Sequence, residues 1–208
     1  MRNTRCLRLG IVALIVGLAV CVTVPVPASA QLPWPLPGGG SSSTGTGATA
    51  LAVTVLGSTT SFASTGNLAN WSDALGTALD SAGGSLGSAE VLAATAIGSG
   101  DGVASDASLG DLVLSILGTQ ITATSAYATA FADNTGATGG WSTLDGLAVN
   151  GVSIVPTGAP NQTISLGAVT LVLNEVTYSA SGIVVNALHI TSLDGTVDVI
   201  VASATAGQ

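Results

Sequence analysis

The sequence predicts an all-β protein, namely a single antiparallel β-sandwich-like domain with one short helix. Three observations predict this class. From residue 48 onward the chain alternates with a period of two, its runs are rich in Val, Ile, Thr and Ala, and Gly, Asn, Asp and Ser interrupt the runs at short intervals. A β-solenoid is the alternative architecture, because small threonine-rich strands could stack, although no fixed repeat period supports it.

Residues 1–30 have the pattern of a secretory signal peptide. Three arginines precede an almost purely apolar run at 9–24, and Ala28-Ser29-Ala30 is a small-x-small cleavage site. The apolar run is shorter than a membrane span, so we expect no stable membrane insertion after cleavage. Retention of the segment as an uncleaved anchor is the alternative.

Residues 31–47 are predicted to be a linker. Its first part, 32–37, alternates proline with bulky residues and favours extended, polyproline-like backbone. The remainder, 38–47, is a Gly/Ser/Thr tract of the kind that forms flexible tethers. The all-β domain is therefore expected to occupy 48–208.

Strand-like runs follow one another along this domain, with one exception. Leu68, Trp71, Leu75 and Leu79 recur at helical spacing, so the sequence predicts a short helix over 68–82 that covers an open end of the sheets. The clearest strand runs are 50–56, 90–97, 109–117, 119–132 and 169–178.

Two dipeptides predict β-hairpins with a defined register. Asn150-Gly151 favours a two-residue turn that pairs Val149 with Val152. Asp194-Gly195 has the same effect and sets Leu188, Ile190 and Ser192 opposite Val201, Val199 and Val197.

Several segments of the C-terminal half resemble the bacterial choice-of-anchor P family of exported domains. They are 124–130, Gly140-Trp141-Ser142, 147–151, 158–166, 171–175 and 184–190. The resemblance implies a secreted or cell-surface domain and supplies no catalytic or binding residues. Because 202–208 carry neither a sorting motif nor an apolar tail, we expect a freely secreted product.

Composition excludes several functions. All three basic residues and both cysteines lie in the predicted signal peptide, so cleavage changes the net charge from −8 (3 minus 11) to −11 (0 minus 11). A phosphate backbone needs Lys or Arg to displace its counterions, so we expect no nucleic-acid partner. Since 47% of residues are hydrophobic but only 3% aromatic, the core is expected to consist of Ala, Val, Leu and Ile.

Two patterns raise the question of hydrolytic chemistry. Gly83-Gly84-Ser85-Leu86-Gly87 fits the G-x-S-x-G nucleophile pattern, which requires a strand, a turn and then a helix, whereas here strand-like sequence follows. The sole histidine, His189, is predicted to lie diagonally opposite Asp198, as in the rear half of a serine-hydrolase triad. We interpret the match at Ser85 as a chance occurrence in a chain rich in Gly and Ser, and His189 as a structural residue that a carboxylate or a backbone group satisfies.

Asp101, Asp106 and Asp111 are the candidate metal ligands. They occur at intervals of five in a Gly/Ser-rich stretch, and acidic loops of this kind can hold Ca²⁺. The spacing matches neither an EF-hand nor a calcium-binding β-helix, so solvated turn aspartates are the alternative. No other cofactor is expected.

These observations favour a non-catalytic, secreted or loosely surface-associated structural or adhesive domain of a bacterium. An extracellular Ca²⁺- or glycan-binding module is the alternative, and a serine hydrolase is a remote one. Expected partners are envelope or matrix components, a glycan, or further copies of the chain.

Overall fold

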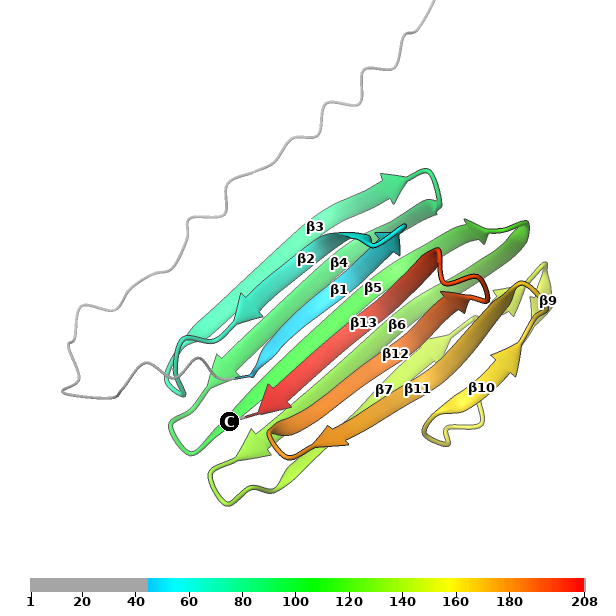
Figure 1. Ribbon diagram of the computed structural model, residues 1–208. Coiled ribbons are helices and arrows are strands. Elements are labelled where there is room, and N and C mark those ends of the chain that lie inside the picture. The colour runs from blue at the N-terminus through cyan, green and yellow to red at the C-terminus, as the bar shows by residue number, and fades with distance from the viewer. Residues whose placement is uncertain (1–44, 208) are drawn as a thin grey trace, which may run out of the picture. The chain divides into compact units, whose positions relative to one another are not determined.

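The computed structural model describes residues 45–207, and these residues form two antiparallel sheets that pack face to face (Figure 1). The signal peptide predicted for 1–30 and most of the predicted linker lie outside the described residues. The sheets do not close into a barrel, so a sandwich-like fold is confirmed and a solenoid is not seen. No helix among the described residues is long and apolar enough to cross a membrane.

Sheet A contains six strands from the two ends of the described chain, in the order β10-β11-β12-β13-β1-β2. The first two strands and the last four therefore meet where β1 pairs with β13. The strands are β1 (Gly47–Val55), β2 (Ser58–Asn67), β10 (Gln162–Ser165), β11 (Val169–Ser179), β12 (Gly182–Ser192) and β13 (Val197–Gly207).

Sheet B contains the seven strands between them, in the order β3-β4-β5-β6-β8-β9, with β7 also paired to β6. The chain therefore crosses from one sheet to the other twice, after β2 and before β10. The strands are β3 (Ala74–Gly84), β4 (Gly87–Gly98), β5 (Gly102–Ile116), β6 (Thr119–Asp133), β7 (Thr138–Asp145), β8 (Ala148–Val149) and β9 (Val152–Ser153).

The core between the sheets consists of aliphatic residues. Every buried hydrophobic residue in the described part of the chain is Ala, Val, Leu or Ile, as the composition predicts. The largest fully buried side chains come from both sheets: Leu68, Leu92, Leu112, Leu114, Ile116, Ile121, Leu147, Leu171, Leu173, Ile183, Leu188 and Ile190.

Both predicted hairpins are confirmed. Val149 pairs with Val152 across Asn150 and Gly151, and both turn residues have the positive φ that this turn requires. Leu188 pairs with Val201 and Ile190 with Val199. In the second turn, Asp194 accepts hydrogen bonds from Ser192 and Thr196, and these bonds lower the pKa of its carboxyl group to about 2.

The helix predicted over 68–82 is wrong, because residues 74–84 form strand β3, paired with β4. Leu75 and Leu79 are four residues apart, and that spacing puts two side chains on one face of a strand as well as of a helix. In the short turn before the strand, the side chain of Asn70 accepts a hydrogen bond from the amide of Ser72. Trp71 is half-buried and packs against the core.

One row of residues crosses sheet A at the point where five of its six strands, all except β10, change their inward face. We call this row the crease; it consists of Ala63, Ala50, Ala202, Ala187 and Asn174, the positions that the ladders between β2, β1, β13, β12 and β11 skip. Ala63, Ala202 and Asn174 have positive φ. In β12, for example, Ile183, Val185 and Ala187 are buried before the change, and Leu188 and Ile190 after it.

Sheet B has the same feature. In β5 the buried residues are odd-numbered up to Leu109 and even-numbered from Leu112, and Asp111 between them has positive φ. Val91 of β4 also has positive φ, next to a shift in the register with β5. In β4 and β5, as in five strands of sheet A, the alternation of buried side chains therefore reverses phase once within the strand.

Candidate functional site

His189 lies on the outer face of sheet A between two carboxylates. Its Nδ1 is 3.0 Å from the carboxylate of Glu175 on β11, and its Nε2 is 3.0 Å from Oδ2 of Asp198 on β13. The diagonal pairing of His189 and Asp198 is thus confirmed. The side chain of His189 is 21% exposed, so the imidazole is partly shielded from solvent.

This arrangement favours the charged imidazolium. Burial lowers the pKa of His189, but the hydrogen bonds and negative charges of Asp198 and Glu175 outweigh it, and the net effect raises the pKa. Asn186 completes the cluster, because its Nδ2 donates to Oε2 of Glu175 at 2.6 Å, whereas its buried Oδ1 has no partner among the described residues. The cluster has the character of a structural ion triad.

Glu175 was not predicted from the sequence, and the crease explains why. Val172 is the direct partner of His189 and shares its outer face, so uniform alternation would point Glu175 inward. The positive φ of Asn174 reverses the phase and brings Glu175 to the outer face. Only the positive-φ tendency of Asn could have indicated this from sequence.

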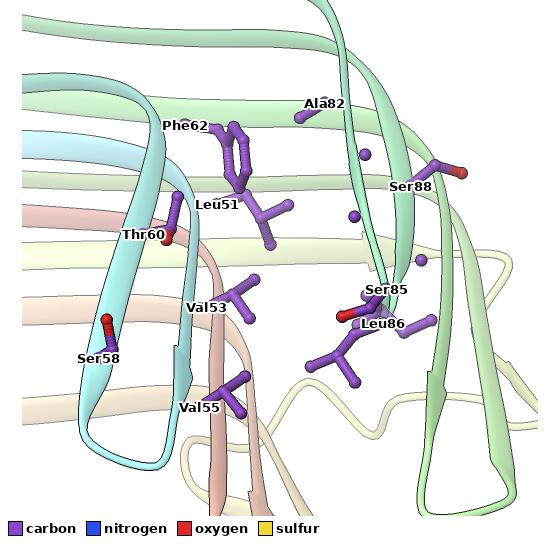
Figure 2. Close-up of a pocket in the computed structure, with 14 residues that line it drawn as sticks. Leu51, Val53, Val55, Ser58, Thr60, Phe62, Ala82, Ser85, Leu86 and Ser88 are labelled. Carbon is purple, nitrogen blue, oxygen red and sulfur yellow. The ribbon is translucent and has the colours of Figure 1, made fainter. Parts of the chain in front are cut away.

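Ser85 lies at the tip of the β3–β4 hairpin, at the rim of a cavity of about 380 Å³ (Figure 2). Leu51, Val53 and Val55 of β1 line one side of the cavity and Leu86 lies beside Ser85. The setting is strand, turn, strand, without the helix that a nucleophile elbow needs. The apolar walls suit a hydrophobic group.

The structure does not bring Ser85 and His189 together. Ser85 shares its cavity with Leu51 and Val53, which point inward from sheet A, whereas His189 projects from the outer face of that sheet. The backbone of sheet A therefore separates the hydroxyl from the imidazole, and the two cannot exchange a proton directly.

The three candidate calcium ligands are spread along β5 and the turn before it. Asp101 lies in the turn before β5, and Asp106 and Asp111 lie within β5. At about 3.3 Å per residue, five residues of strand span about 16 Å, so one ion cannot contact all three. The described residues contain no group of three His, Cys, Asp or Glu side chains that could hold a metal ion.

A different feature stands out on the outer face of sheet B, where exposed aromatic side chains gather along β6 and β7. Trp141 is 53% exposed and Phe131 is 51% exposed. The rings of Tyr127 and Trp141 are in contact, with centroids 5.1 Å apart and an interplanar angle of 51°. We call Tyr127, Phe131 and Trp141 the aromatic face.

Asp106 belongs to this surface rather than to a metal site. The hydroxyl of Tyr127 donates to Oδ1 of Asp106 at 2.5 Å. Burial and this hydrogen bond raise the pKa of Tyr127 above its ordinary value. One of the three predicted aspartates therefore has a defined role as an acceptor beside an aromatic ring.

A hollow of about 300 Å³ continues from Trp141 toward sheet A. Its lining includes Tyr178 at the end of β11 and Pro160 in the loop before β10. Tyr178 is also largely exposed. The sequence alternation of Tyr127, Thr129 and Phe131 could have indicated a shared outer face, but the partnership with Trp141 depends on the β6–β7 register.

Comparisons with known proteins give no relative for this chain: no family model, no curated protein and no solved structure matches it.

Proposed function

We propose that this protein is a non-catalytic, secreted or cell-surface-associated structural or adhesive β-domain of a bacterium. The observation that carries the proposal is the separation of Ser85 from His189 by the backbone of sheet A. A serine hydrolase needs the base within hydrogen-bonding reach of the nucleophile, and here both ring nitrogens of His189 bind carboxylates.

The surface of the domain supports an adhesive role. Across β1 and β2 the outer face of sheet A presents hydroxyl pairs, since Thr54 bonds Thr59 at 2.8 Å and Thr49 bonds Ser64 at 2.9 Å. Strands β2 and β3 each have one neighbour in their described sheets, so one backbone edge of each remains open. Open edges of this length are templates for pairing with another chain.

Location outside the cell is part of the same proposal. The signal-peptide pattern of 1–30 and the resemblance to the choice-of-anchor P family both favour export. No observation in the structure favours calcium as a ligand.

A survey of hydrolytic activity tests the non-catalytic proposal. We expect purified protein to show no turnover of generic esterase, glycosidase and peptidase substrates. Turnover that disappears in both Ser85→Ala and His189→Ala would overturn it, while activity retained in both variants indicates a contaminating enzyme.

Cell fractionation with N-terminal sequencing tests the location. We expect the protein in the medium or loosely attached to cells, with Gln31 as its first residue. Recovery only inside the cell, with Met1 retained, would contradict this part of the proposal.

A further inference from the structure

Half of the described aromatic side chains gather on one surface of a protein that has very few. The chain contains three Trp, two Tyr and two Phe, and all of these except Trp34 are described. Three of those six form the aromatic face on the solvent side of sheet B. Exposed aromatic clusters mark interaction sites more reliably than scattered exposed aliphatic residues do.

The backbone holds the three rings in fixed positions. The ring of Phe131, on β6, packs over Gly139 of the neighbouring strand β7. A Cβ atom on Gly139 would lie 2.4 Å from this ring, so any side chain there would displace it. Tyr127 is fixed at one end by Asp106 and along its ring by Trp141. Rigid aromatic groups lose little conformational entropy when a ligand binds.

Polar side chains lie between the rings on the same face. Thr129 stands between Tyr127 and Phe131 on β6, directly opposite Trp141 and, on its other side, Asp106. Ser108 and Thr143 pair with Tyr127 from the two neighbouring strands. Tyr127 and Trp141 therefore each have a hydroxyl-bearing residue one strand spacing away, about 4.8 Å. Phe131 has Ala104 and Gly139 opposite it, and its polar neighbour on this face is Thr129, two residues along β6.

We propose that the aromatic face binds a neutral glycan by stacking sugar rings on Trp141, Phe131 and Tyr127. A pyranose with equatorial hydroxyls has an apolar face of C–H groups that packs on the electron-rich face of an aromatic ring, and a rim of hydroxyls that needs hydrogen-bond partners. The interleaved rings and polar groups of sheet B offer both. This inference rests on the proposed function, because it names the ligand of a binding domain.

Charge selects neutral glycans over acidic ones. No Lys or Arg occurs in the described residues, and Asp106 lies within the surface itself. Sulfated, phosphorylated or uronate sugars would meet repulsion without a basic partner, whereas Asp106 can accept hydrogen bonds from uncharged hydroxyls.

A protein partner fits this surface less well. A protein interface of standard affinity has an apolar centre with polar groups at its rim. Here Thr129 stands at the centre, among the three rings. Binding to a protein or to a second copy is therefore a competing outcome that the test below separates.

Affinity electrophoresis tests the proposal. The folded domain is run through native gels that contain hydroxyethylcellulose, glycol chitin, xylan or mannan, with polygalacturonate as the acidic comparison. We expect at least one neutral polysaccharide to retard the wild type and polygalacturonate to have no effect. Trp141→Ala should weaken binding about tenfold or more, Phe131→Ala should weaken it less, and Trp141→Phe should restore most of it.

Leu193→Ala is the matched control, because it truncates an exposed apolar side chain in the turn between β12 and β13 of sheet A. It should leave retardation unchanged, and unchanged thermal midpoints should show that all variants are folded. Retardation by none of the neutral polysaccharides, or equal retardation of wild type and Trp141→Ala, overturns the proposal. A wild-type dimer that Trp141→Ala converts to a monomer would overturn it in favour of self-association.

The same gels separate this proposal from the proposed function. Retardation accompanied by release of reducing sugars would keep the glycan ligand and refute the non-catalytic function. No retardation together with no hydrolysis would refute the glycan ligand alone.

Discussion

His189 is the only histidine of the chain, and it is held between Glu175 and Asp198. Its charged form gains two charge-assisted hydrogen bonds, which outweigh the cost of partial burial and raise its pKa. The imidazole links three neighbouring strands, β11, β12 and β13, and its protonation therefore contributes to the stability of sheet A.

The pH dependence of stability follows from this raised pKa. The contribution of His189 is complete below the unfolded pKa of about 6.5 and is lost as the pH rises through the higher folded pKa. Urea unfolding between about pH 5.5 and 8.5 should show stability falling as the pH increases.

His189→Gln is the control for this prediction, and its stability should be nearly independent of pH over the same range. A direct check is the NMR titration of the single imidazole. A folded pKa below that of an unfolded histidine would contradict the interpretation.

At the scale of the strands, the crease marks the limit of prediction from sequence. The hairpin registers at Asn150-Gly151 and Asp194-Gly195 were predictable, because turn chemistry fixes them locally. The helix expected over 68–82 failed, because a four-residue spacing fits a strand equally well and pairing with β4 decided the outcome.

In the candidate sites, too, contacts within one hairpin were predictable from the sequence and contacts that depend on other strands were not. The approach of Asp198 to His189 was predictable within one hairpin. Glu175 was not, because its face depends on the positive φ of Asn174. The aromatic face combines β6 with β7, and its hydrogen-bonded acceptor Asp106 comes from β5, so it required the order and register of three strands.

Two glycines in different strands test how closely the elements pack. A Cβ atom on Gly140 of β7 would lie 2.4 Å from the carbonyl oxygen of Thr129 and 2.7 Å from Val185. Gly140→Ala should therefore lower the free energy of unfolding by about 1–3 kcal/mol, measured by urea denaturation.

Gly76→Ala in β3 is the matched substitution with the opposite expectation. Its Cβ would have no neighbour closer than 3.8 Å, so the smaller backbone entropy of Ala should raise stability by about 0.5 kcal/mol. Equal effects of the two substitutions would show that β7 lies less close to β6 and to sheet A than described.

For the whole molecule, the unusual feature is that basic and acidic residues lie in separate parts of the sequence. All three Lys and Arg residues lie within the first eight positions, while all eleven acidic residues lie beyond residue 70. We therefore expect mutual repulsion of carboxylates and surface hydroxyl groups to keep the domain in solution.

Trypsin provides a simple test at this scale. The protein should give no tryptic fragment that begins after residue 9, even when denatured in urea, because trypsin requires Lys or Arg. Chymotrypsin-like cleavage at aromatic residues of the same denatured sample is the positive control. Mass spectrometry that finds a cut within the described residues by pure trypsin would refute this account of the charge.

The crease also constrains how such a chain can change in length. On the two sides of the phase reversal, the strands point alternate sets of side chains inward. A deleted residue would therefore exchange the buried and exposed side chains of half a strand. A shift of the whole strand along its neighbour could restore the correct face for one half only. Insertions and deletions should consequently accumulate in the hairpin turns. The middles of the strands should keep their spacing even where their side chains are exchanged.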